Sequence, residues 1–135
     1  MTQRTLVLLK PDTVRRGLVG RVIARFEAKG LRIVAMDQRM VTAELADRHY
    51  AEHVEKAFYP PLRDFVTSGP IVAMVLEGDA AVDVVRAING ATDGRQAAPG
   101  TIRGDLSLSN RENLVHGSDS PESAEREIAL WFPDL

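Results

Sequence analysis

The sequence contains no cysteine. Disulfide bonds, thiolate zinc sites and cysteine nucleophiles are therefore excluded, and a reducing compartment is the natural setting. Long apolar runs are missing as well, because the longest ones, such as Ile71 to Leu76, are far too short to cross a bilayer. We therefore expect no membrane partner.

An excess of positive charge is also absent. Lys and Arg total 17 against 19 Asp and Glu, which gives a net charge of −2. This balance creates no global field for nucleic acid, so any anion must be bound by a local cluster. A secretory leader is not evident, because charged residues follow the short apolar segment Thr5 to Leu9 at once. We expect a cytoplasmic protein without a nucleic-acid partner.

The size and composition are those of a folded globular protein. The chain has 135 residues, of which 44% are apolar and 27% are charged. A chain of this length builds one hydrophobic core. We therefore expect a single domain over residues 1–135.

Four segments have the character of β-strands. Thr5–Leu9 and Ile71–Leu76 are wholly apolar, as strands buried on both faces are. Leu31–Val41 contains several polar residues, which suits a strand at the edge of a sheet. Leu114–His116 is a short last strand. The two apolar strands are thus expected at the centre of the sheet.

Helices are expected between these strands. Gly30 stands where a C-terminal cap belongs. Ser120 is in position to cap the N-terminus of the last helix, and Pro121 follows it at the first helical position. The expected helices are Leu18–Lys29, Ala43 to His53, a short one after Pro61, Ala80–Asn89 and Ser120 to Trp131. The order fits an α+β fold, a ferredoxin-like αβ sandwich with a four-stranded antiparallel sheet (βαββαβ) and helices on its surface.

His116 is the first candidate for chemistry, because it ends a strand and faces a polar turn. On a 3.6-residue period Glu127 shares the apolar face of the last helix with Ala124 and Trp131, and a buried carboxylate needs a partner. A bond from Glu127 to one imidazole nitrogen would leave the other free to attack. A structural histidine and a carboxylate at the helix edge remain the alternatives. A hydrolase triad with Ser118 is disfavoured, because no Gly-x-Ser-x-Gly motif is present.

A second set of residues suits phosphate. The segment from Gly90 to Glu112 has no helical or strand periodicity, yet it is rich in glycine and contains Arg103, and arginine matches phosphate oxygens. Lys10 follows a central strand, and Arg86 lies at the border of an apolar helix arc. A solvated loop and surface cations are the alternatives.

His49 and His53 stand one helical turn apart, a spacing that holds metal ions in some proteins. No third ligand is evident and the His-Glu-x-x-His pattern is absent, so a metal site here is disfavoured. Tyr50 and Phe58 fit either the core or a cleft.

Taken together in order and spacing, six motifs closely resemble those of the nucleoside diphosphate kinase family, from Thr5 to Phe132. The motifs are Thr5–Asp12, Thr67–Pro70, Gly90–Thr92, Pro99–Asp105, Asn113–Asp119 and Glu122–Glu127.

The resemblance implies a ping-pong transfer of the γ-phosphate of a nucleoside triphosphate, typically ATP, to a nucleoside diphosphate such as GDP. His116 is the implied nucleophile through Nδ1, and Glu127 is its orienting partner. Mg²⁺ is the implied cofactor, carried by the phosphates without direct protein ligands. The implied nucleotide contacts are Lys10, Phe58, Arg86, Thr92, Arg103 and Asn113, with Ser118 and Tyr50 supporting the histidine.

The chain departs from the common family pattern at several positions. Thr13 and Gly94 replace a frequent glycine and a frequent proline, and Glu112 replaces a common arginine. Tyr59-Pro60-Pro61 stands where Phe-x-Gly is common. The resemblance also implies a homo-oligomer, with a hexamer favoured over a tetramer. A non-enzymatic nucleotide-binding domain and a phosphocarrier domain on the same scaffold remain the alternatives.

Overall fold

The computed structural model describes residues 2–135. The strands are β1 (Thr2–Leu9), β2 (Arg32–Arg39), β3 (Ile71–Asp79) and β4 (Val115–Gly117). The helices are α1 (Pro11–Arg15), α2 (Val19–Lys29), α3 (Ala43–His49), α4 (Tyr59–Val66), α5 (Ala81–Asn89), α6 (Ile102–Leu106) and α7 (Pro121–Trp131). No helix in this described part of the chain is long and apolar enough to span a membrane.

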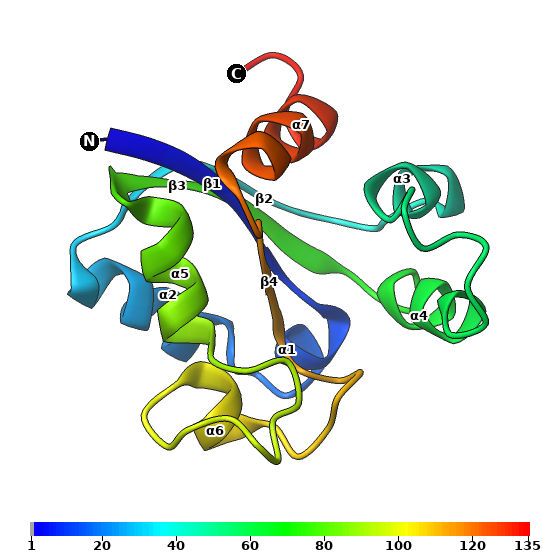
Figure 1. The fold of residues 1–135 in the computed structure, drawn as a ribbon, viewed down its shortest axis with the longest axis horizontal. Helices are drawn as coiled ribbons and strands as arrows, with labels where there is room; N and C mark the ends of the chain where they lie inside the picture. The colour runs from blue at the N-terminus through cyan, green and yellow to red at the C-terminus, as the bar shows by residue number, and fades with distance from the viewer. Residues whose placement is uncertain (1) are drawn as a thin grey trace.

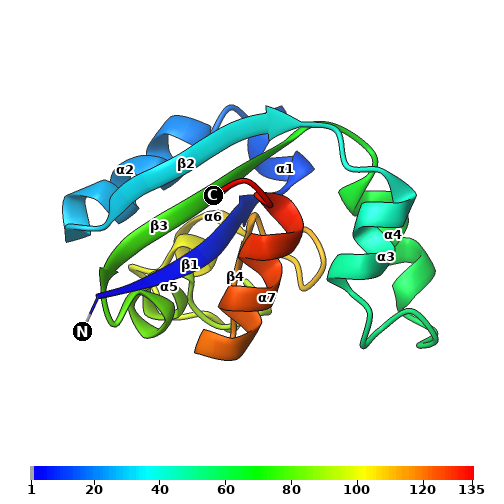
Figure 2. The same cartoon turned by 90° about the horizontal axis from the view of Figure 1, so that it is seen from above.

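The strands form one antiparallel sheet in the order β2-β3-β1-β4. The two apolar strands therefore occupy the centre and the polar β2 lies at an edge, as the hydrophobic pattern predicts. The ferredoxin-like α+β fold is confirmed. Figures 1 and 2 show α2 and α5 on one face of the sheet and α7 on the other, with α3 and α4 at one end.

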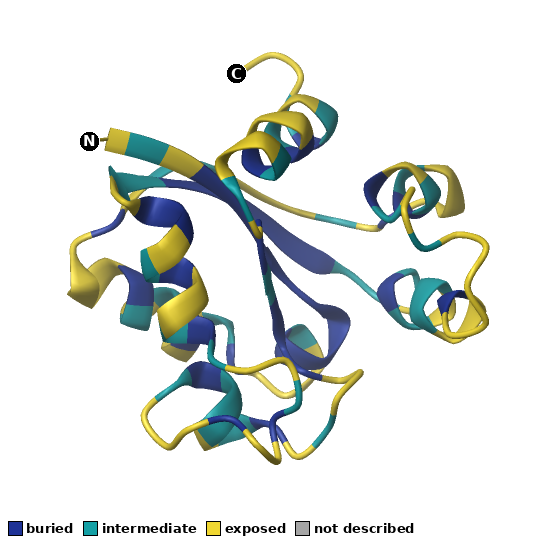
Figure 3. Ribbon diagram, viewed as in Figure 1, coloured by how far each residue is buried: buried dark blue, intermediate teal, exposed yellow. Residues whose placement is uncertain are grey.

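Each face of the sheet has its own apolar core, because successive strand residues point to opposite faces. Val7 and Leu9 pack with Phe26 of α2 and Val85 of α5. On the opposite face, apolar residues of β1 and β3 pack with Trp131. The buried colouring in Figure 3 follows the two central strands through the middle of the molecule. This double coverage holds the end of β1 and all of β4 in fixed positions.

The region between α3 and β3 differs from the prediction. The helix after Thr42 ends at His49 rather than His53, and residues 50–58 form successive tight turns. The next helix begins at Tyr59 and includes both prolines in its first turn instead of following them. Proline is tolerated there because the first helical N–H groups have no partner within the helix.

The long segment from Gly90 to Glu112 contains the short helix α6, which its polarity did not reveal. Thr101 caps it by accepting a hydrogen bond from the Gly104 N–H at 2.9 Å. The left-handed cap expected at Gly30 is present, with φ of 108°. Helix α1 was not expected either, and it begins directly after Lys10.

Candidate active site

A cleft of about 750 Å³ opens where β4, α3, α5 and the Gly90–Glu112 segment meet. Nine of the ten predicted site residues line it, and the tenth, Ser118, is buried directly behind it. The lining residues among them are Lys10, Tyr50, Phe58, Arg86, Thr92, Arg103, Asn113, His116 and Glu127.

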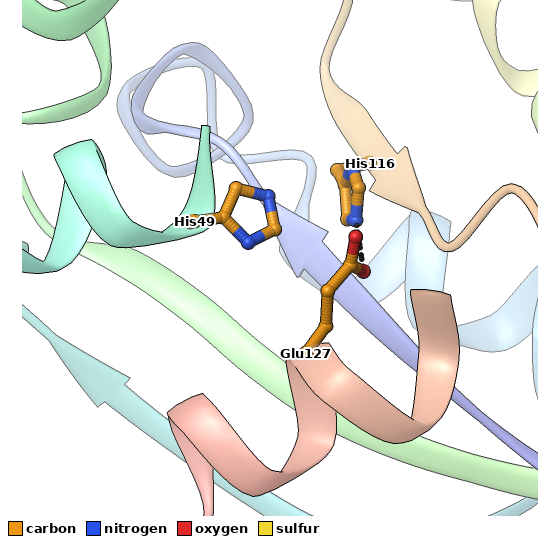
Figure 4. A group of neighbouring side chains, drawn as sticks. All are labelled: His49, His116 and Glu127. Atoms are coloured by element: carbon orange, nitrogen blue, oxygen red, sulfur yellow. Dashed lines mark hydrogen bonds and ion pairs between the residues drawn. The ribbon is translucent and has the colours of Figure 1, made fainter. Parts of the chain in front are cut away.

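His116 and Glu127 are in direct contact at the centre of the cleft (Figure 4). The His116 Nε2 and Glu127 Oε1 atoms are 2.8 Å apart. The Ser118 hydroxyl donates to the same oxygen at 2.7 Å and itself accepts from the Leu6 N–H at 3.3 Å. Since the carboxylate accepts a hydrogen bond from Nε2–H, the proton of the neutral ring lies on Nε2 and Nδ1 keeps its lone pair. Within residues 2–135, Nδ1 of His116 has no hydrogen-bond partner.

The sequence of α7 places Glu127 here. The Ser120 hydroxyl accepts from the Ser123 N–H at 3.1 Å, and Pro121 occupies the first turn. The resulting helix buries Ala124, Glu127 and Trp131 on one face. Burial alone would raise the pKa of Glu127, but the hydrogen bonds from His116 and Ser118 reverse this and lower it. Glu127 is thus an anion held against the imidazole.

The residue before β4 has a strained backbone. Leu114 has a φ of 74°, which is uncommon for a residue other than glycine. Its N–H donates to Asp12 at 3.1 Å, and its carbonyl accepts from the Thr13 hydroxyl at 2.6 Å and from the Lys10 N–H at 2.8 Å. The start of α1 therefore fixes the strand that carries His116. Thr13, a departure from the family pattern, contributes one of these bonds.

Arg103 uses part of its guanidinium to bind the backbone. Its guanidinium donates to the carbonyls of Asn113 (3.2 Å), Gly90 (2.9 Å) and Val115 (2.6 Å). Arginine has five N–H groups, so donors remain for an anion in the cleft. Burial, followed by the neighbouring charge of Arg86, lowers the pKa of Arg103 to about 10.

Lys10 lies at the inner end of the cleft and is only 8% exposed. Its Nζ donates to the Asn113 side-chain oxygen at 2.8 Å. Asn113 in turn donates to the carbonyls of Thr92 and Asn110, both at 3.0 Å. Burial, followed by the charge of Arg103, lowers the pKa of Lys10 to about 8, against a weaker opposing effect of Asp12. Lys10 is thus a buried cation with a lowered pKa beside a second cation, and such a pair favours the binding of phosphate.

The outer part of the cleft is more exposed. Phe58 is 50% exposed, and its ring contacts the His53 ring at 5.4 Å between centroids. Arg86 and Thr92 are exposed at the cleft rim, and Arg86 forms no hydrogen bond or ion pair with the described residues. Tyr50 packs edge-on against His49 at 4.6 Å between centroids, and burial raises the pKa of its hydroxyl.

Two of the family departures have a visible structural reason. The Gly94 N–H donates to the Ser109 carbonyl at 3.0 Å, and a Cβ at this position would lie 2.3 Å from the Ser107 carbonyl oxygen. Proline, which has no N–H, therefore does not fit this loop. In the other departure, the Tyr59 hydroxyl donates to Asp47 at 2.6 Å and ties α4 to α3.

His49 is the site residue whose position sequence reasoning missed. It was considered as a metal ligand with His53, but the structure places His49 beside His116 and Glu127, with ligand atoms within 4.8 Å of one another. His53 instead has its Nδ1 3.2 Å from the Lys56 ammonium. The signal for His49 was its helical spacing from buried Ala46, which puts both on the inner face.

The three-residue group suits a metal ion poorly. The Trp131 indole N–H donates to His49 Nδ1 at 3.0 Å, so that nitrogen is already an acceptor and the ring proton lies on Nε2. His49 therefore offers no free lone pair, whereas a ligating histidine needs one.

Comparisons with known proteins give one result. A family model described as nucleoside diphosphate kinase matches residues 3–135. The chain is 77% identical to a nucleoside diphosphate kinase of Nocardioides sp. (strain ATCC BAA-499 / JS614) over 100% of both chains. It is 60% identical to that of Mycobacterium tuberculosis (strain ATCC 25177 / H37Ra) over 98% of both.

A solved structure agrees with these relatives. A halophilic nucleoside diphosphate kinase from Halobacterium salinarum in complex with CDP superposes with a TM-score of 0.96. The two sequences are 50% identical, over 99% of this chain and 90% of that one. Sequence, fold and motifs therefore agree, and the chain belongs to the nucleoside diphosphate kinase family of phosphotransferases.

Proposed function

We propose that the chain transfers the γ-phosphate of a nucleoside triphosphate, typically ATP, to a nucleoside diphosphate such as GDP through a phosphohistidine at His116. The observation that carries this proposal is the bond between Nε2 and Glu127, which leaves Nδ1 free within a cationic cleft. In the first step Nδ1 bonds to the γ-phosphorus, the bond from that phosphorus to the β–γ bridging oxygen breaks, and the nucleoside diphosphate leaves. A second nucleoside diphosphate then takes the phosphoryl group by the reverse step.

Glu127 is the positioning residue for this chemistry. It accepts a hydrogen bond from the Nε2–H group throughout and so stabilises the positive charge that the imidazole gains when Nδ1 becomes bonded. Ser118 holds the carboxylate oxygen by a second hydrogen bond. Tyr50 supports the same region by packing against His49.

The cations serve the phosphate oxygens. Phosphoryl transfer needs positioned positive charge more than covalent assistance, and Lys10, Arg86 and Arg103 line one cleft. Asn113 and Thr92 are placed for the sugar and phosphates, and the exposed ring of Phe58 offers a flat surface for a base. Stacking of this kind accepts any base.

We further propose that Mg²⁺ enters on the nucleotide phosphates. The carboxylates at the cleft are too few and too dispersed for a protein-built magnesium site, since Glu127 is already bonded to His116 and Ser118. Asp119 and Glu52 are the other acidic residues that line it. When bound, the ion would neutralise part of the phosphate charge.

The proposal includes the context of the enzyme. Residues 1–135 form one domain that acts in the cytoplasm as a homo-oligomer, a hexamer rather than a tetramer, without membrane or nucleic-acid partners. The exposed side chains of Met36 and Met40, on and beside the edge strand β2, support association. Analytical ultracentrifugation measures the subunit number directly.

The test of the reaction uses γ-labelled ATP with Mg²⁺. The proposal requires an acid-labile label on the protein that moves to added GDP or dTDP as labelled triphosphate. A label that moves only to other proteins would favour a phosphocarrier. If no label is bound, a nucleotide-binding domain without transfer activity is indicated.

A further inference from the structure

His49 is a buried histidine on the cleft wall for which the proposed reaction assigns no chemical role. It is 4% exposed, and its ring meets that of His116 edge-on, with centroids 4.7 Å apart and planes at 78°. It lines the same cleft as His116, and this ring contact places it beside the proposed nucleophile.

Trp131 fixes the tautomer of this ring. An indole N–H can only donate, so the 3.0 Å bond to Nδ1 makes Nδ1 the acceptor. The proton of the neutral ring must then lie on Nε2. Burial is the main cause that lowers the pKa of His49 to about 3, with a contribution from the nearby charge of Arg126, although Glu127 opposes this. His49 is therefore a neutral N–H donor at physiological pH.

The Nε2–H group of His49 has no acceptor in the described part of the protein. Figure 4 shows one ring nitrogen of His49 on the side that faces His116, while the other lies below. Nδ1 is the nitrogen engaged by Trp131, so Nε2 is the one available to the cleft. A donor without a protein acceptor, at the wall of a cleft lined by Lys10, Arg86 and Arg103, is available to an anionic ligand.

We propose that the Nε2–H of His49 donates a hydrogen bond to an oxygen of the phosphoryl group while that group is bonded to Nδ1 of His116. This inference rests on the proposed function. No bond is made or broken at His49, and its proton stays in place.

The neutral state of His49 is what makes this role compatible with the rest of the site. A charged His49 would attract the carboxylate of Glu127, which must stay on His116. The Trp131 bond prevents this competition, because it keeps Nδ1 unprotonated. The arrangement thus adds a hydrogen-bond donor for the phosphoryl oxygens without adding a second cation that would compete with His116 for the Glu127 carboxylate.

The first test needs no variant. In protein labelled with ¹⁵N at histidine, the ¹⁵N shifts must show His49 unprotonated at Nδ1 and protonated at Nε2. Phosphorylation with ATP and Mg²⁺, followed by removal of ADP, must move the His49 Nε2–H proton downfield. A resonance that stays in place on phosphorylation, or a proton found on Nδ1, overturns the proposal.

Variants provide the second test. In His49→Phe the donor is lost, and the single-turnover rate of phosphohistidine formation should fall about 100-fold, as expected for one such donor. In His49→Gln an amide N–H remains at a similar reach, and the rate should recover by about tenfold over His49→Phe. ADP affinity serves as the control, because a purely structural role would change it together with the rate. The melting temperature of His49→Phe should fall in any case, because the Trp131 N–H loses its acceptor.

The outcomes separate the two proposals. Wild-type protein that forms no phosphohistidine contradicts the proposed function and the inference with it. Wild-type protein that forms phosphohistidine, with a His49→Phe variant equally fast, overturns only the inference.

Discussion

The two sides of the cleft are built differently. On the inner side, Glu127 is 6% exposed and Lys10 is 8% exposed, and both are hydrogen-bonded to other side chains. On the outer side, Phe58 is 50% exposed and Leu108 is 86% exposed. Under the proposed function, the inner side binds the phosphates, which are the same in every nucleotide, whereas the outer side contacts the base, which varies. Buried and hydrogen-bonded side chains thus stand where the proposed chemistry needs exact geometry, and exposed ones stand where it needs tolerance.

Removal of the nucleophile should have the largest effect. In His116→Ala, transfer should fall by at least about 10,000-fold, because no other group can carry the phosphoryl intermediate. The labelled-ATP assay measures this loss. ADP binding by calorimetry should stay near the wild-type value, since the cations remain. Residual transfer near the wild-type rate would show that the inner side works without a covalent intermediate.

Loss of the orienting carboxylate should matter next. Glu127→Ala should lower the single-turnover rate by about 100-fold, because the imidazole loses its fixed tautomer and its charge partner. Glu127→Gln is the matched variant, since its amide oxygen still accepts a hydrogen bond from Nε2–H. Its rate should lie between those of Glu127→Ala and the wild type. Equal rates for Ala and wild type would remove Glu127 from the mechanism.

Lys10 should make the affinity of the inner side for ADP depend on pH. Its pKa of about 8 in the free protein means that it loses its proton as the pH rises through that value. A bound phosphate favours the charged form, so binding takes up a proton and ADP affinity should fall as the pH rises from about 7 to about 9. In Lys10→Gln the affinity at pH 7 should be about tenfold lower, with a flat profile over that interval. Calorimetry in buffers of different ionisation enthalpy measures the proton uptake.

The outer side should be the most tolerant. Phe58→Ala should raise KM about fivefold for every nucleotide, because it removes a stacking surface, with kcat little changed. Phe58→Tyr keeps the flat ring and should behave like the wild type. A change confined to one base would contradict the comparison, since it would mean that the outer side reads base identity.

Much of the inner side could be predicted from the sequence. Helical phase places Glu127 among Ala124 and Trp131, and the structure buries all three on one face of α7. The strand end at His116 and the Ser120 cap are local signals, and they bring the carboxylate back toward the imidazole. The position of His49 could not be predicted, because it is 67 residues before His116 and only its helix's inner face was visible in the pattern.

Other features could not be predicted from the sequence, because they depend on contacts between residues far apart in the chain. The positive φ of Leu114 exists only because Asp12 and Thr13, about a hundred residues earlier, bond its backbone. Residues 50–53 were predicted to continue the helix that begins at Ala43, but they form the first of the tight turns at 50–58. The hydrogen bonds of Arg103 to three carbonyls could not be predicted either, since the pattern of side chains in a sequence does not indicate which backbone groups will accept a hydrogen bond.

The sequence by itself determined the central strands, the polar edge, the capped last helix and the motifs of the family. These depend on local periodicity and on side-chain chemistry, which are written in consecutive residues. Only the tertiary structure decided which nitrogen of His49 is free, because that depends on a partner distant in the chain. Glu127 holds Nε2 of His116, and Trp131 holds Nδ1 of His49. Hydrogen-bond donors and acceptors are assigned by packing, and packing brings together residues that the sequence keeps apart.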